Sequence, residues 1–203
     1  MPTTKHDNYI SEKEYLKGEL ISNVKHEYVQ GQVYAMAGAS PNHGKITGNI
    51  ARHLGNFLEN SSCFPYASDM KVKTSTGSYR YPDVVVVCDD NFIEEGYVTE
   101  SPVIIFEVLS RTTRKIDEQE KLVEYINIPT LQYYVILEQN VVDVTVYSKA
   151  DDWHSKHYFL DQKIHFENIN MFLTVSDIYQ RVQNEDMVEY LALKNNRFSP
   201  SRE

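Results

Sequence analysis

Two acidic side chains stand at positions of the sequence where a charge needs a partner. Residues 102–109 are apolar except for Glu107 and predict a buried strand, and Asp83 directly precedes the valine run 84–87. An ionised carboxylate in such surroundings costs free energy unless a cation or hydrogen-bond donors compensate it. If neighbouring strands bring Asp83 and Glu107 together, the pair indicates a metal site, because hard divalent cations such as Mg²⁺ take oxygen ligands.

The buried carboxylate also has a simpler interpretation as half of an internal ion pair. Glu107 paired with Arg80 would contribute to the specificity of the fold and not to catalysis. Side chains alternate across a strand, so Glu107 shares a face with Ile105, and Asp83 shares one with Val85. Both interpretations stay open, and the presence of the second acid favours the metal site.

A helix expected over residues 115–127 presents Asp117, Lys121 and Tyr125 on one face, at i, i+4 and i+8. The helix begins soon after the Glu107 strand, so Lys121 can point back toward that carboxylate. A lysine there would orient an attacking water or stabilise the charge of a phosphorane-like transition state. The alternative is an Asp–Lys pair on the helix surface, which spacing alone favours and which contributes only a few tenths of a kcal/mol.

A compact basic cluster, Arg111, Arg114 and Lys115, stands at the start of that helix, with Thr112 or Thr113 as its N-cap. Cations and backbone N–H groups at a helix N-terminus together suit phosphate. A solvated basic turn is an equally good interpretation, so phosphate binding is one of two hypotheses for the cluster.

Four further side chains are candidates for supporting roles: Glu27, His43, Asp117 and Tyr125. Glu27 belongs to an expected hairpin, and His43 lies in the first turn of an expected helix. A single His or Glu is more often structural, so Glu27 and His43 are the weaker candidates.

Capping signals and periodicity predict the elements that must position these residues. Ser11 and Glu14 fit a capping box for a helix over 11–20, and Gln30-Gly31 fits the turn of a hairpin over 26–36. A second helix begins at Ser40-Pro41, and its buried face is expected to hold Ile46, Ile50, Leu54 and Phe57. Strands are expected at 63–66, 70–74, 81–88, 131–137, 141–147, 153–160 and 163–166, and a last amphipathic helix at 175–193.

This order of elements indicates an α/β fold, with one central mixed β-sheet flanked by helices. The 203 residues are enough for a single domain with a full core, so we expect one domain over 1–203. Within it we expect a core over about 10–150, C-terminal strands and a helix over about 151–193, and a frayed tail over 194–203.

Composition limits the classes of function. The chain is 41% hydrophobic and 24% charged, which excludes a chain disordered throughout. Its net charge of −9 argues against a protein that coats nucleic acid, but not against an enzyme with a small basic opening. Cys63 and Cys88 cannot form a disulfide framework, and neither a signal segment nor a membrane span is recognisable. We therefore expect a cytoplasmic protein without membrane contact.

The motifs in this order resemble the PD-(D/E)XK nuclease superfamily, and most closely its Uma-type branch, which is classed with restriction endonucleases. The resemblance rests on Pro82-Asp83, on Glu107-Val108-Leu109-Ser110, and on Asp117, Lys121 and Tyr125. It extends to residues 27–34, 40–43 and 133–137, and covers about 10–150.

The resemblance implies a restriction-endonuclease-like core, Mg²⁺ dependence with Mn²⁺ as a substitute, and hydrolysis of DNA phosphodiester bonds. Asp83 and Glu107 would be the carboxylates that bind the metal. The superfamily places a lysine two residues after the glutamate, where this chain has Leu109. The resemblance therefore implies that Lys121, on the following helix, is the functional equivalent of that lysine.

Two other functions stay open. The chain could be a non-catalytic interaction protein that keeps the nuclease fold, which its acidic charge and Leu109 both favour. It could also be a metal-dependent hydrolase of a smaller phosphoester. Double-strand cleavage by so small a chain with one site would favour a homodimer.

Overall fold

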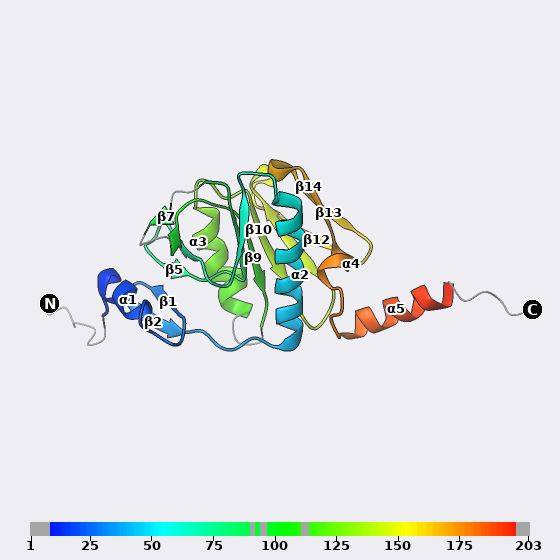
Figure 1. Ribbon diagram of the computed structural model, residues 1–203, viewed down its shortest axis with the longest axis horizontal. Coiled ribbons are helices and arrows are strands. Elements are labelled where there is room, and N and C mark those ends of the chain that lie inside the picture. The colour runs from blue at the N-terminus through cyan, green and yellow to red at the C-terminus, as the bar shows by residue number, and fades with distance from the viewer. Residues whose placement is uncertain (1–8, 90–91, 94–96, 111–113, 198–203) are drawn as a thin grey trace, which may run out of the picture.

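The largest layer of the protein is a six-stranded sheet, here called the central sheet. The computed structural model describes residues 9–89, 92–93, 97–110 and 114–197 (Figure 1). The strand order of the central sheet is β12-β11-β10-β9-β6-β3, in which only β9 and β10 are parallel neighbours. Its strands span Phe64–Ala67 (β3), Val84–Val87 (β6), Pro102–Val108 (β9), Tyr133–Leu137 (β10), Val144–Ser148 (β11) and Ser155–Tyr158 (β12).

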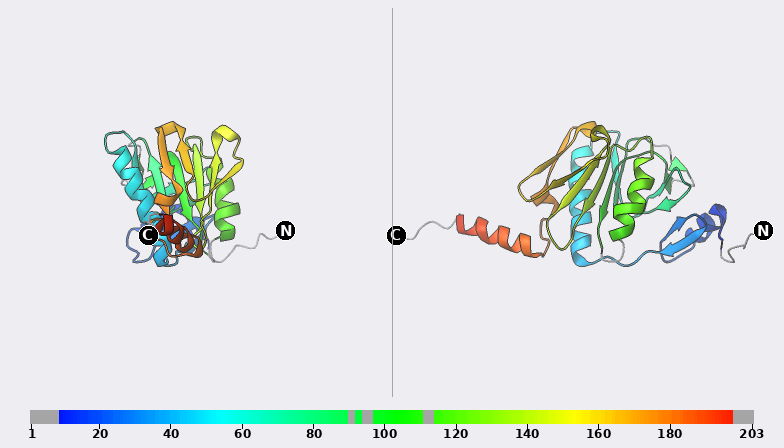
Figure 2. Two further views of the ribbon diagram at one scale, coloured as in Figure 1. Left: turned by 90° about the vertical axis from the view of Figure 1, so that its right-hand side faces the viewer. Right: turned by 180° about the vertical axis from the view of Figure 1, so that it is seen from behind.

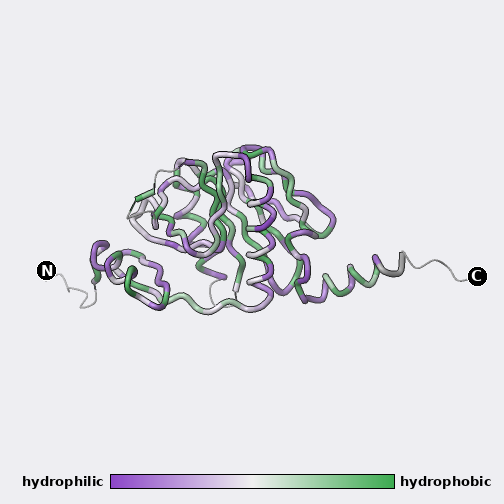
Figure 3. The backbone as a smooth tube through the Cα atoms, in the orientation of Figure 1, coloured by the Kyte–Doolittle hydropathy of each residue, from purple (hydrophilic) through white to green (hydrophobic). Residues whose placement is uncertain are grey.

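Each face of the central sheet packs against a different helix, and Figures 1 and 2 show α2 and α3 on opposite sides of it. Val84 and Phe106 point toward α2, whereas Val85 and Ile105 point toward α3. Figure 3 shows hydrophobic residues concentrated in these inner strands. The covering elements span Pro41–Leu58 (α2), Ile116–Lys121 (η2), Leu122–Ile126 (α3), Lys163–Phe166 (β13), Met171–Thr174 (β14) and Val175–Ile178 (α4).

A second six-stranded sheet, here called the outer sheet, has the order β2-β1-β5-β4-β8-β7. Its strands span His26–Val29 (β1), Gln32–Ala35 (β2), Lys71–Lys73 (β4), Tyr79–Arg80 (β5), Phe92–Ile93 (β7) and Val98–Thr99 (β8). Helix α1 (Glu12–Glu19) packs on it through Tyr15, which lies against Tyr28 and Tyr79. The chain passes from β5 to β6, and so from the outer sheet to the central sheet, through residues 81–83.

The predicted mixed α/β fold is confirmed, together with several of its local signals. The capping box of Ser11 and Glu14 is present at α1, and Ser40 caps α2 by accepting a hydrogen bond from the His43 N–H. Gln30 and Gly31 both have positive φ, as a two-residue hairpin turn with the twist of its strands requires. These signals could be predicted because each depends on residues within a few positions of one another.

The buried face of α2 differs from the prediction at its end. Ile46, Ile50 and Leu54 are buried as expected, but Phe57 is 51% exposed and Leu58 is buried instead. The buried row continues in steps of four residues, and Leu58 is the next member of that row. The prediction of Phe57 as a core residue is therefore wrong.

The single C-terminal helix predicted over 175–193 is also wrong. The chain leaves α4 after Ile178, turns at Arg181 in the left-handed region, and begins α5 (Glu185–Arg197), where the Asn184 side chain accepts from the Met187 N–H. Helix α5 extends past the expected start of the frayed tail at 194, and residues 198–203 lie outside the described part of the chain. Two short 3₁₀ turns, η3 (Lys149–Asp151) and η4 (Glu167–Ile169), complete the described elements.

The two cysteines form a disulfide, Cys63–Cys88, which corrects the interpretation drawn from the sequence. Phe64 pairs with Val87 in the antiparallel β3–β6 ladder, so the flanking residues Cys63 and Cys88 face each other. The cysteine content thus no longer supports the expected reducing compartment, and the cytoplasmic location stays a prediction. Among the described residues, no helix is long and apolar enough to cross a bilayer.

The rotation of α2 can be tested with two neighbouring substitutions. Leu58→Ala should lower the free energy of unfolding by about 2–5 kcal/mol, because it removes buried methyl groups and leaves a cavity. Phe57→Ala is the matched control and should change it by no more than about 0.5 kcal/mol, as at other exposed positions. Urea unfolding followed by circular dichroism measures both, and a larger loss for Phe57→Ala would show that the assigned face is wrong.

Candidate active site

The two acids predicted to bind a metal lie on neighbouring strands of the central sheet. Val84 of β6 pairs with Phe106 of β9, and the same antiparallel register continued by one residue places Asp83 opposite Glu107. The Asp83 Oδ2 accepts a hydrogen bond of 2.7 Å from the Val108 N–H. His43, at the start of α2, holds the same oxygen at 3.2 Å through its Nε2. Asp83 is thereby fixed over the end of β9, beside Glu107.

Lys121 is buried and is surrounded by carboxylates. Its side chain is 6% exposed, and its Nζ lies 2.9 Å from Glu107 Oε1, 3.1 Å from Asp117 Oδ1 and 3.1 Å from Glu27 Oε1. The Tyr125 hydroxyl donates to the same Glu107 oxygen at 3.1 Å. The alternative of a helix pair on the protein surface is therefore wrong: Lys121 and Tyr125 of the predicted face contact Glu107, and Asp117 contacts Lys121.

The helical segment that carries Asp117 and Lys121 contains a widened turn. Residues Ile116–Lys121 form a π-helix, and α3 continues from Leu122. The Tyr134 hydroxyl of β10 donates to the Asp117 carbonyl at 2.8 Å and ties the turn to the central sheet. Because π-helical turns are rare and recur at functional sites, the distortion is an independent sign that this segment is not an ordinary covering helix.

The electrostatics follow from the number of acids that share the site. Burial raises the pKa of Glu107 well above its usual value; Lys121 opposes this rise, whereas the nearby carboxylates Asp117, Asp83 and Glu27 add to it. Burial alone would lower the pKa of Lys121, but Glu107 and Glu27 outweigh burial and raise it. Lys121 is thus held as a cation in a pocket of excess negative charge.

Glu27 is connected to Lys121 on one side and to Arg80 on the other. Burial alone would raise the pKa of Glu27, but Lys121 and Arg80 outweigh burial and lower it. Arg80 contacts Glu27 at 2.9 Å and Glu124 at 2.8 Å. The structure therefore does not form the ion pair between Glu107 and Arg80 that the sequence left open.

Glu124 is a member of this network that the sequence analysis did not name, and Arg80 was considered there only as a possible partner of Glu107. Glu124 follows Lys121 by three residues, which places the two on the same side of a helix and is a recognisable signal. Arg80 stands between two tyrosines and two residues before the Pro82-Asp83 motif, but nothing in that spacing reveals its two partners. Both partners of Arg80 are more than 40 positions away in the sequence.

The predicted basic cluster does not form a free cationic surface in the described residues. Arg114 pairs with Glu118 at 3.0 Å and donates to Glu138 at 2.6 Å. Lys115 is exposed, whereas Arg111 and both expected N-cap threonines lie outside the described residues. The phosphate-binding hypothesis for the cluster stays a prediction.

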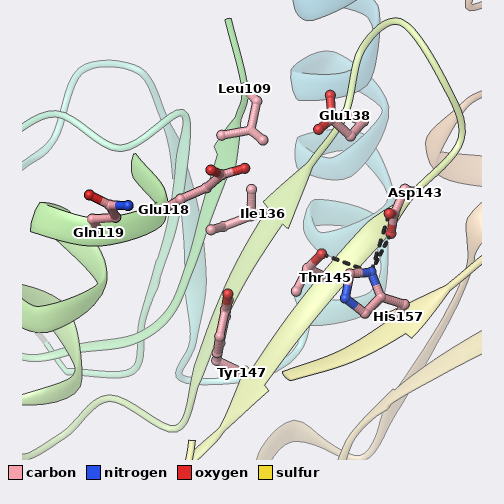
Figure 4. Close-up of a pocket in the computed structure, with 9 residues that line it drawn as sticks. All are labelled: Leu109, Glu118, Gln119, Ile136, Glu138, Asp143, Thr145, Tyr147 and His157. Carbon is pink, nitrogen blue, oxygen red and sulfur yellow. Dashed lines mark hydrogen bonds and ion pairs between the residues drawn. The ribbon is translucent and has the colours of Figure 1, made fainter. Parts of the chain in front are cut away.

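A cavity of about 290 Å³ lies beside the site, on the β10–β12 side of β9 (Figure 4). It begins at Leu109, two residues after Glu107, and neither Glu107 nor Asp83 lines it. In it, His157 Nδ1 lies 2.9 Å from Asp143 Oδ1. Its walls are formed by Leu109, Glu118, Gln119, Ile136, Glu138, Asp143, Thr145, Tyr147 and His157. The cavity is adjacent to the acidic pair and separate from it.

The site contains more carboxylates than cations, and carboxylate oxygens are the ligands that a hard divalent cation takes. The permanent cations Lys121 and Arg80 contact four carboxylates, those of Glu27, Glu107, Asp117 and Glu124, and Asp83 adds a fifth near Glu107. In the described part of the chain, no group of three or more His, Cys, Asp or Glu side chains has the arrangement of a metal site. Asp83 and Glu107 stay the predicted ligands, and one or two carboxylates are the usual protein contribution to Mg²⁺, which keeps several waters.

The fold and the site define a protein with a restriction-endonuclease-like architecture. A solved structure described as "a putative nuclease belonging to DUF820", from Anabaena variabilis, superimposes with a TM-score of 0.72 and 14% sequence identity. The match covers 86% of this chain and 99% of that one. At this identity the similarity establishes the shared fold.

The family follows from the sequence comparisons. Residues 13–173 match the model of the Uma2 family, described as "Putative restriction endonuclease", and the chain belongs to that family. Two Synechocystis sp. proteins are similar to it, each named as an uncharacterized protein. One, slr1290, is 33% identical over 84% of this chain and 92% of its own length. The other, sll1609, is 34% identical over 68% of this chain and 80% of its own length.

The acidic pair can be tested by its effect on stability. If Asp83 and Glu107 bind Mg²⁺, a tenfold excess over the dissociation constant should stabilise the parent by about 1.4 kcal/mol, or about 3–6 °C in melting temperature. Asp83→Asn and Glu107→Gln should each remove the shift. Asp143→Asn, in the neighbouring cavity, is the control and should retain it. A parent whose melting temperature is indifferent to Mg²⁺ and to chelator would contradict the assignment.

Proposed function

We propose that this chain is a metal-dependent endonuclease that hydrolyses DNA phosphodiester bonds. The observation that carries the proposal is the buried ammonium of Lys121, held at 2.9 Å from Glu107, on the strand whose Val108 N–H binds Asp83. A lysine and two carboxylates at the ends of two neighbouring strands provide the charges that phosphodiester hydrolysis requires. Membership of the Uma2 family supports the same reaction class.

The chemistry divides between a bound cation and the side chains of the chain. A divalent ion held by Asp83 and Glu107 would supply positive charge to the scissile phosphate and a bound water of lowered pKa. Lys121 presents a fixed ammonium, so its charge needs no reorganisation when negative charge develops in the transition state. Tyr125 fixes the Glu107 carboxylate, and the Val108 N–H fixes that of Asp83.

DNA is the substrate class that we propose, although the chain has a net charge of −9. General electrostatic attraction would not hold DNA on such a surface, so phosphate contacts must come from local cations. Lys115 and Arg114 stand at the start of the helical segment that carries Lys121, and Arg114 would have to exchange Glu138 for phosphate. A homodimer would place two such sites on the two strands of a duplex.

Two alternative functions, an interaction protein and a hydrolase of a smaller phosphoester, can be distinguished from a DNA endonuclease. Lys121 already contacts three carboxylates, which would suit a purely structural cation in a non-catalytic interaction protein. A site that hydrolyses a smaller phosphoester would cleave a substrate such as bis-p-nitrophenyl phosphate but leave plasmid DNA intact.

Lys121→Met tests the catalytic role directly. Removing a preorganised donor to transition-state charge should lower the rate of plasmid nicking on the order of 10²-fold, with Mg²⁺ affinity little changed. Because Lys121 is buried among carboxylates, its loss should also reduce stability, by about 3–5 kcal/mol. Rates should therefore be measured well below the melting temperature of the variant.

Lys115→Met is the matched control, since it removes an exposed lysine from the same helical segment. As a proposed phosphate contact it should weaken DNA binding, but the nicking rate at saturating DNA and the stability should stay unchanged. Nicking by Lys121→Met at the parental rate would refute its catalytic role. A parent that cleaves neither plasmid nor the small phosphoester, with Mg²⁺ or Mn²⁺ present, would favour the interaction protein.

A further inference from the structure

Arg80 is a buried arginine whose guanidinium joins two elements on either side of Lys121. It is the last residue of β5 and is 2% exposed. Its Nε and Nη2 donate to the two oxygens of Glu124 at 2.8 and 2.9 Å, and its Nη1 donates to Glu27 Oε2 at 2.9 Å. All three contacts are charge-assisted, and the pair with Glu124 is bidentate.

These contacts complete a ring formed by Lys121, Glu27, Arg80 and Glu124. Glu27 uses its second oxygen, Oε1, to contact Lys121 Nζ at 3.1 Å and to accept from the Tyr81 N–H at 3.3 Å. Glu124 stands three residues after Lys121 in the same run of helix. Arg80 therefore binds both Glu27, which contacts Lys121, and Glu124, which lies on the same helical segment as Lys121.

We propose that Arg80 is a positioning residue for the reaction: by holding Glu27 and Glu124 together, it fixes where the Lys121 ammonium stands relative to Glu107. The inference rests on the proposed function, in which Lys121 is the catalytic cation. Arg80 contacts Lys121 only through these partners, so its effect on the reaction is indirect.

The geometry explains why an arginine is needed at this position. A guanidinium presents a planar fork of donors that spans Glu27 and Glu124 at once, whereas a lysine ammonium is a compact point charge. Arg80→Lys keeps the positive charge but can hold only one of the two carboxylates at full strength. Glu27 or Glu124 would then be free to move, and Lys121 would move with it.

The position of Lys121 can be observed without any activity assay. In protein labelled with ¹⁵N-lysine, a buried and ion-paired ammonium gives a distinct NMR signal, which Lys121→Met identifies by its loss. Arg80→Lys should shift or broaden that signal, whereas Lys73→Met should leave it unchanged. Lys73 is the matched control because it also ties the N-terminal elements to the outer sheet, through Glu12 at 2.9 Å, but lies outside the ring.

The kinetic consequence separates positioning from stability. Arg80→Lys should lower kcat for nicking by about 10-fold or more with KM and Mg²⁺ affinity retained, in the range expected for loss of an outer partner of a site. Lys73→Met should lower the melting temperature and leave kcat unchanged. If Arg80→Lys does not fold, Glu124→Gln is measured instead, because it removes the charge of one of the two carboxylates that Arg80 holds.

Either of two results would overturn the proposal. An unchanged Lys121 signal in Arg80→Lys would show that the guanidinium does not set its position. An equal loss of kcat in Arg80→Lys and Lys73→Met would show that Arg80 acts through stability alone. Failure of the proposed function is distinguishable from both, because an inert parent removes the kinetic comparison but leaves the NMR result decisive for Arg80.

Discussion

The compensation of one buried negative charge organises this end of the molecule. Glu107 lies inside β9 among apolar neighbours and is 4% exposed, so its charge must be met locally. Lys121 and Tyr125 meet it from the helical segment, on the face opposite to α2. Lys121 in turn requires more than one carboxylate to offset its own burial, which explains why Glu27 and Asp117 converge on it as well. The network therefore consists of buried charges, each of which is offset by the next.

The carboxylate pair could be predicted from the sequence because it depends on short-range patterns. Two apolar runs, each with one acid, predict strands and place each acid on a face. The burial of Lys121 could not be predicted in the same way. The spacing of Asp117 and Lys121 is the same in an exposed helix pair, and what distinguishes the two is the π-helical turn and the sheet face beneath it. Both depend on tertiary packing.

The other differences have the same origin in long-range contacts. Arg114 belongs to a basic cluster in the sequence, but it donates to Glu138, which is 24 positions away. The disulfide depends on the register of β3 and β6, which no cysteine spacing reveals. In both cases the partner is distant in the sequence, so the local pattern does not identify it.

The segment that connects the two sheets links the position of Arg80 to that of Asp83. Residues 81–83 carry the chain from β5 to β6, so Arg80 and Asp83 stand at opposite ends of one short segment. Pro82 restricts that segment, because its ring fixes φ and restricts Tyr81 as well. Tyr81 is also held by its N–H to Glu27. A displacement of β5 would therefore move the positioning arginine and the predicted metal carboxylate together. Since β1 of the N-terminal hairpin pairs with β5 and supplies Glu27, the outer sheet acts as the frame on which both halves of the site are aligned.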